Sequence, residues 1–123
     1  MALEIRVIPG EFSVCQVEEL GRDALAEPFC FVGKTDEERS LVCPIDAVPE
    51  RTLSRDDGWS MFGIVGALDF SLVGVLANIS RVLADAGVGL FAVSTYNTDY
   101  ILVKKENLPR ALEALRAAGY EIS

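Results

Sequence analysis

The chain has no histidine among its 123 residues. Histidine is the usual general base near neutral pH and a frequent metal ligand, so its absence weighs against an enzyme and against a zinc site. Carboxylates alone could catalyse a reaction, but neither Asp69 nor Asp99 has a visible nucleophile or metal partner. We therefore expect no catalytic residue, no metal and no cofactor.

Basic residues are also scarce, since 11 lysines and arginines stand against 19 aspartates and glutamates and give a net charge of −8. Binding to nucleic acid needs a basic surface, so we expect no nucleic-acid partner. Most of the acids lie in residues 1–58. We interpret them as a solvated face, with an interaction with a basic partner as the alternative.

A long apolar run is missing as well. No stretch approaches the roughly 18 residues that cross a bilayer. The first ten residues, MALEIRVIPG, lack the basic and apolar regions of a signal peptide. We expect no contact with a membrane and a cytoplasmic location.

Cysteine occurs three times, at Cys15, Cys30 and Cys43, each within an apolar stretch. No pair has the CxxC spacing, and an odd number argues against a set of disulfides. We expect these residues to be small core side chains. A redox or catalytic role is the alternative.

The second half of the chain alternates strand and helix patterns. Residues 59–68 predict a strand in which Gly63 and Gly66 let another group pack closely. Apolar residues from Leu72 to Ala86 recur at helical spacing, with Ser71 as the expected N-cap and Gly87 as the end. Strands at 88–94 and 99–104, a helix from Asn107 to Gly119 and a closing strand in "YEI" complete the series. The order β-α-β-β-α-β predicts an α+β, ferredoxin-like domain whose helices cover one face of an antiparallel sheet.

The first half is a weaker version of the same pattern. Residues 3–8 and 12–18 are expected to form a hairpin around "PG", and "FCFVG" and "RSLVC" a second strand pair. A short helical segment lies between them, and residues 44–57 look like a linker. Shifting the chain by 61 residues sets Val32 on Val93 and Leu41 on Leu102. We expect a degenerate half at 1–57 and a complete domain at 58–123.

Polar side chains gather in "STYNTDY", residues 94–100, between two apolar strands. The free N–H groups expected near Leu72, Val73 and Gly74, at the start of the first helix, form a potential anion site. Carboxylates at Asp69 and Asp99 could bind an ammonium group, so the two sets together suit a free amino acid. Each residue alone could instead cap a helix or shape a turn.

These features resemble the ACT domain family. The resemblance rests on "DFSLVGVL" after the first strand of the second half and on "STYNTDYILVKKENLPRALEALRAAG". In particular the chain is similar to small tandem-ACT proteins and to the ACT units of cytosolic arginine sensors. Residues 59–123 carry the match strongly, and residues 10–50 carry it weakly.

The resemblance implies a non-catalytic regulatory module that binds an amino acid at the strand-to-helix loop, often at an interface, and so a homodimer. The family commonly has an acid and then Pro-Gly before the helix, whereas here Val73 replaces the proline. In the sensor-like relatives the "TD" of the hairpin contributes to binding, which carries onto Thr98 and Asp99. The expected ligand-binding residues are Asp69, Phe70, Ser71, Leu72, Val73, Gly74, Ser94, Thr95, Asn97, Thr98 and Asp99. The alternative is an oligomerisation or protein-interaction module without a ligand.

Overall fold

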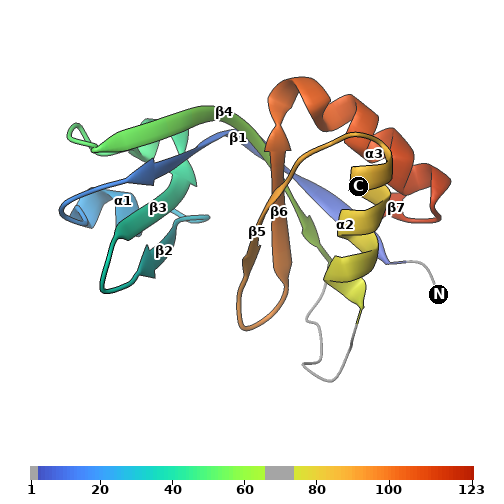
Figure 1. Cartoon of the computed structure of the whole chain (residues 1–123), viewed down its shortest axis with the longest axis horizontal. Coiled ribbons are helices and arrows are strands. Elements are labelled where there is room, and N and C mark those ends of the chain that lie inside the picture. Colours follow the sequence, from blue (N-terminus) through green and yellow to red (C-terminus); the bar gives the residue numbers. More distant parts are fainter. Residues whose placement is uncertain (1–2, 66–73) are drawn as a thin grey trace. The chain divides into compact units, whose positions relative to one another are not determined.

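A computed structural model of the chain describes residues 3–65 and 74–123 (Figure 1). The chain divides into two compact units. The C-terminal unit comprises Met1–Pro9 and Ser60–Ser123, and the N-terminal unit comprises Gly10–Trp59. Strands β1 (Glu4–Gln16) and β4 (Ser54–Ile64) each contribute residues to both units. The first nine residues group with the C-terminal unit, and the N-terminal unit ends at Trp59.

The C-terminal unit has the predicted β-α-β-β-α-β order. Its elements along the chain are β4, α2 (Val75–Asp85), β5 (Phe91–Ser94), β6 (Asp99–Lys104), α3 (Leu108–Ala117) and β7 (Glu121–Ile122). The strands are arranged in the order β7-β1-β4-β6-β5. The α+β, ferredoxin-like prediction is confirmed, with one addition: the start of β1 lies between β4 and β7, where it pairs with β7 in parallel.

The expected hairpin around Pro9 and Gly10 is wrong, because β1 is one strand of 13 residues. Its two ends have different partners: Glu4 and Ile5 pair with β7, whereas residues 12–16 pair with β3 (Arg39–Pro44). Gly10 adopts a φ of +102°, a value that glycine reaches without steric cost. The pair Pro9–Gly10, which usually marks a turn, therefore lies within one extended strand.

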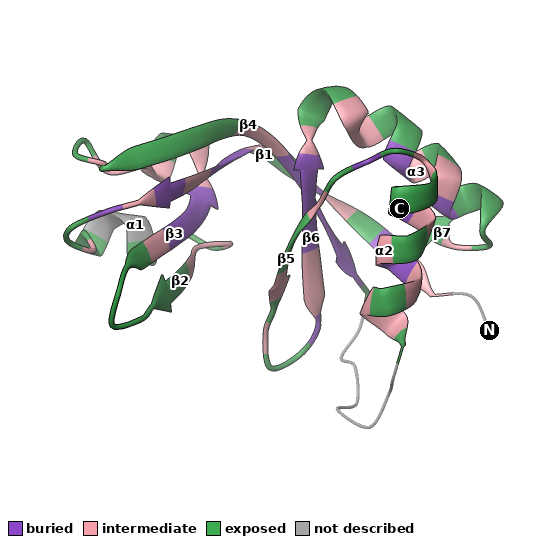
Figure 2. Ribbon diagram, in the orientation of Figure 1, coloured by how far each residue is buried: buried purple, intermediate pink, exposed green. Residues whose placement is uncertain are grey.

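The core of the C-terminal unit lies between the sheet and its two helices, which pack on the same face (Figure 1). Figure 2 shows the buried residues on β4 and β6 and on the inner sides of α2 and α3. Strand residues alternate between the two faces of a sheet, so this face receives every second residue of each strand. The buried members of this core are Ile5, Phe62, Ile64, Ile79, Leu83, Val88, Ile101, Val103, Ala111 and Leu115.

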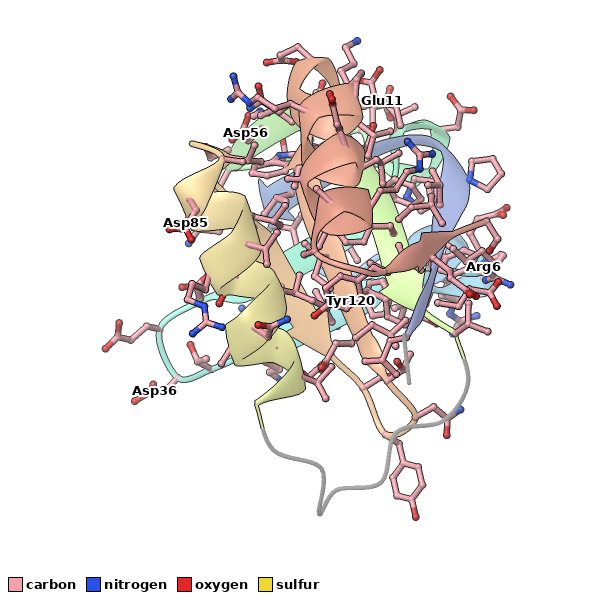
Figure 3. All side chains as sticks on the ribbon, turned by 90° about the vertical axis from the view of Figure 1, so that its right-hand side faces the viewer. Arg6, Glu11, Asp36, Asp56, Asp85 and Tyr120 are labelled. Atoms are coloured by element: carbon pink, nitrogen blue, oxygen red, sulfur yellow. The ribbon has the colours of Figure 1, made fainter. Side chains whose placement is uncertain are left out.

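Tyr120 joins the end of α3 to α2. Figure 3 shows it beneath the two helices, and its hydroxyl accepts a hydrogen bond from Asn78 Nδ2. Asn107 stands at the N-cap of α3, as expected, but makes no side-chain capping bond there. Its Oδ1 instead accepts a hydrogen bond from Arg110 Nη2 at 3.4 Å.

The N-terminal unit repeats the arrangement in reduced form. Its strand order is β2 (Phe31–Lys34), β3, β1 and β4. The first helix is shortened to α1 (Arg22–Ala26), and a 3₁₀ turn, η1 (Ile45–Ala47), follows β3. The expected linker at 44–57 is wrong from Ser54 onward, because "SRDD" already belongs to β4. Those four residues are exposed, so their charge is compatible with a strand.

The two β-hairpins correspond at a shift of 60 residues, not 61. Phe31 pairs with Val42 in the first hairpin, and Phe91 pairs with Leu102 in the second. Register in a hairpin is set by its turn. An alignment of the two halves by their apolar residues alone can be wrong by one residue. Such an error of one residue assigns each strand side chain to the opposite face of the sheet.

Candidate functional site

The polar segment 94–100 closes the β5–β6 hairpin largely with its own side chains. Ser94 and Asp99 are direct partners in the register, and Ser94 Oγ donates to Asp99 Oδ1 at 2.6 Å. The Thr95 N–H donates to the Thr98 carbonyl at 2.9 Å, and the Thr95 hydroxyl donates to the same oxygen at 3.1 Å. Several of these groups therefore stabilise the turn itself, which is the alternative to ligand binding that the sequence left open for each of them.

The first hairpin has a similar turn. The Thr35 N–H donates to the Glu38 carbonyl at 2.9 Å, and Thr35 Oγ1 accepts from the N–H groups of Glu37 and Glu38. Beside this turn the Ser40 hydroxyl donates to the Glu38 carboxylate, as Ser94 does to Asp99. Both hairpin turns therefore contain a threonine, Thr35 or Thr95, whose hydroxyl bonds to the backbone of its own turn.

Thr98 ties the second hairpin to the end of β4. Its side chain is buried, and its Oγ1 donates to the carbonyl oxygen of Ile64 at 3.0 Å. Residue 65 is the last one described before the strand-to-helix segment. The hairpin thus lies beside the point where β4 ends.

Five predicted ligand-binding residues, Asp69 to Val73, lie outside the described residues. The next one, Gly74, is the N-cap of α2. The helix begins at Val75 and not at Leu72, because Gly74 has a φ of +83°, which a right-handed helix excludes. The first intrahelical bond runs from the Asn78 N–H to the Gly74 carbonyl at 2.9 Å. The amides without an intrahelical partner at this helix start are therefore those of residues 74–77.

Strand alternation divides the hairpin residues between two faces. Ile101 belongs to the core beneath the helices, so Asp99 and its partner Ser94 lie on the helix-bearing face. Thr98 and Tyr100 lie on the opposite face. There, together with Asn97, they line a hollow of about 370 Å³. We name it the Arg6 hollow; its described lining is Arg6, Ile8, Gly63, Ile64, Val65, Asn97, Thr98 and Tyr100.

Arg6 and Tyr100 are the parts of this hollow that sequence reasoning missed. Arg6 is an exposed residue between two core positions, Ile5 and Val7, of β1, and Figure 3 shows it on the side of the unit away from α2. The alternation in "EIRVI" could have placed it on the outer face. Tyr100 packs over Gly63, which confirms the close approach predicted at that glycine.

The cysteines lie in the N-terminal unit. Cys15 and Cys43 are buried beside Leu41, and Cys30 packs against this cluster with partial exposure, so the core prediction is confirmed for the first two. Burial raises the pKa of the Cys43 thiol to about 12 and also raises the pKa of Cys15 and of Cys30. Thiols held in the protonated form are poor nucleophiles.

A network of polar side chains also lies in this unit. The buried Ser13 donates to Asp57 Oδ1 at 2.7 Å, and Arg55 forms a two-pronged ion pair with the same carboxylate. The network joins β1 to β4 and has a structural role. Across residues 3–65 and 74–123, no group of three His, Cys, Asp or Glu residues is arranged to hold a metal ion. Within the same residues, no helix has the length and apolar character of a membrane span.

Comparison with known proteins gives a family and several similar structures. A family model described as the ACT domain matches residues 54–117. No curated protein matches the chain. Protein Atu0741 from Agobacterium tumefaciens is 28% identical with a TM-score of 0.90, and the match covers 100% of this chain and 93% of that one.

Two further structures share the fold at lower identity. Protein VC0802 from Vibrio cholerae, described as a possible transport protein, is 22% identical with a TM-score of 0.73, over 94% of this chain and 89% of that one. The regulatory subunit of aspartate kinase from Thermus thermophilus is 16% identical with a TM-score of 0.65, over 97% and 99%. The likeness to this regulatory subunit therefore includes both units of the chain.

Proposed function

Since the chain belongs to the ACT domain family, we propose that it is a non-catalytic regulatory module that binds a free amino acid. One observation carries the proposal: the buried hydrogen bond from Thr98 Oγ1 to the Ile64 carbonyl keeps the polar hairpin beside the end of β4. In the ferredoxin-like arrangement the strand-to-helix segment starts from this point. On this proposal the polar side chains of the β5–β6 hairpin and the free amides at the start of α2 line the same binding site.

Asp99 is the proposed partner of the ligand's ammonium group. It lies on the helix-bearing face, and the Ser94 hydroxyl, 2.6 Å away, holds one carboxylate oxygen while the other oxygen can accept further bonds. The carboxylate of the ligand would bind amides at the start of α2, where the helix dipole favours negative charge. Residues 69–73 are proposed to contact the ligand on the basis of the sequence alone.

The wider context is part of the same proposal. We interpret the N-terminal unit as a degenerate ACT-like copy, because it has the ferredoxin-like strand order with one short helix. The regulatory subunits of aspartate kinase among the similar structures support a regulatory role. A homodimer, a cytoplasmic location and a closer relation to arginine sensors are further expectations from the sequence.

Calorimetry with each of the twenty amino acids, arginine included, tests this function. We expect one or a few of them to bind with a dissociation constant in the micromolar to millimolar range, because a few charge-assisted bonds must offset the cost of immobilising the ligand. Asp99→Asn should weaken that binding about tenfold or more. Asp36→Asn, at the tip of the other hairpin, is the control and should bind normally. Absence of heat with all twenty amino acids would exclude the proposal.

A module that only joins subunits is the second candidate. The observation in its favour is β5, an edge strand of the sheet without a charged residue and with Phe91 37% exposed. Such an edge can pair with a second chain. Native mass spectrometry separates the two candidates: a dimer whose stability does not respond to any amino acid favours this one.

A further inference from the structure

The Arg6 hollow carries one charged group among its described lining residues, the guanidinium of Arg6. The ion pair between Arg55 and Asp57 lies in the N-terminal unit and does not involve Arg6. No described carboxylate therefore neutralises Arg6. Among the described residues, Arg6 is thus a positive group without a paired carboxylate, in a chain whose net charge is −8.

The surrounding surface combines apolar walls with neutral polar groups. Ile8 and Val65 provide aliphatic surface, and Asn97 and Tyr100 provide an amide and a phenol ring. Because residue 63 has no side chain, the Tyr100 ring approaches the strand closely at this point of the hollow. A volume of about 370 Å³ is at the small end of known ligand sites and would hold about a dozen water molecules.

The charge pattern selects the ligand class. A guanidinium matches the two oxygens of a carboxylate with a planar pair of donors. An amino acid would also bring an ammonium group, which finds no carboxylate in the described lining and is repelled by Arg6. An organic acid without an ammonium group brings no such cost.

We infer that the Arg6 hollow is a second effector site that binds a small organic acid, with its carboxylate on Arg6 and its carbon chain against Ile8 and Val65. It lies on the face of the sheet opposite the helices. The amino-acid site proposed at Asp99 lies on the helix-bearing face. The two sites are therefore separate, and either can be lost without the other.

Two-dimensional ¹H–¹⁵N NMR of the full chain tests this inference, with succinate as the organic acid and alanine as the zwitterion, both at matched ionic strength. Succinate should move the resonances of Gly63, Asn97 and Tyr100, and Arg6→Gln should weaken its binding about ten- to a hundredfold. Because Arg6 is exposed, this variant should keep the spectrum of α3 unchanged. Arg116→Gln makes the same charge change on an exposed position of α3 and should bind succinate normally.

Three results would overturn the inference: no succinate shifts at the hollow, equal binding by Arg6→Gln and the unchanged chain, or alanine binding there as tightly as succinate. If a free amino acid moves the resonances of Ser94, Asp99 and Val75, those changes report on the amino-acid site proposed at Asp99. They would leave the organic-acid site unaffected. Added sodium chloride should weaken succinate binding, since the site is open to solvent and its main attraction is electrostatic.

Discussion

The ring of Tyr100 lies so close to Gly63 that a Cβ on residue 63 would stand 2.8 Å from Cε1 and 2.9 Å from Cδ1. Gly63→Ala must therefore displace the ring from its place on the strand. We expect the free energy of unfolding to fall by about 1–3 kcal/mol, the usual cost of overpacking a well-packed site. Urea denaturation followed by circular dichroism measures this change.

The control for this variant is Gly89→Ala, because a Cβ at residue 89 would meet no atom within 4 Å and its φ is not in the left-handed range. Its stability should stay within about 0.5 kcal/mol of the parent chain. Combining Gly63→Ala with Tyr100→Ala should cost less than the sum of the two single changes, since they share one contact. Additive costs would show that the ring does not restrict residue 63.

Gly74 is held at a φ of +83° at the N-cap of α2, with open space where a Cβ would be. The cost of Gly74→Ala is therefore one of backbone conformation and not of contact. We expect a loss of about 1–2 kcal/mol in the free energy of unfolding. The same denaturation experiment measures it, and Gly89→Ala again serves as control. A neutral Gly74→Ala would mean that α2 can begin earlier in the chain, as the sequence pattern alone suggested.

Thr98→Val removes the buried hydroxyl that donates to the Ile64 carbonyl. The side chain keeps its shape, but the buried carbonyl oxygen loses this donor, so we expect a loss of about 1–3 kcal/mol. Thr98→Ser retains the hydroxyl and is the matched control. Equal stability of the two variants would exclude the hydrogen bond as the link between the hairpin and β4.

Much of the C-terminal unit follows from local patterns in the sequence. The periodicity around Ile79 and Leu83 predicts α2, and the alternation in "DYILVK" predicts β6. The insertion of β1 between β4 and β7 could not be foreseen, because it depends on a pairing between residues more than 110 positions apart, such as Ile5 and Ile122. Neither the turn signal at Pro9 and Gly10 nor any local period carries that information.

The place of the polar hairpin in the fold was predictable, but the division of its side chains between the two faces of the sheet was not. The polar composition of residues 94–100 marks the hairpin, and Asp99 and Thr98 are adjacent in the chain. Their alternation sends one side chain toward the helices and the other away from them. Arg6 enters the opposite hollow only through the long-range pairing of β1, so no motif near the hairpin could have pointed to it.

Burial of Cys43 makes the stability of the chain depend on alkaline pH. Its pKa is raised from 9.0 to about 12 by burial in the folded state. Below pH 9 the thiol is protonated in both states, so its effect on stability is constant. Between pH 9 and pH 12 the unfolded chain loses this proton and the folded chain retains it, so the free energy of unfolding falls by about 1.4 kcal/mol per pH unit. Cys15, whose pKa is also raised by burial, acts in the same direction.

Urea denaturation at pH 8, 9 and 10 measures this dependence, and Cys43→Ala is the comparison. Lysines and tyrosines titrate in both proteins, so the difference between the two pH profiles isolates the thiol. We expect the stability lost by Cys43→Ala at pH 8 to shrink by about 1 kcal/mol at pH 10, because the parent chain then has the additional cost of keeping its thiol protonated. A constant difference across the three pH values would show that Cys43 ionises as easily in the folded chain as in the unfolded one, and hence that the cysteine cluster is open to water.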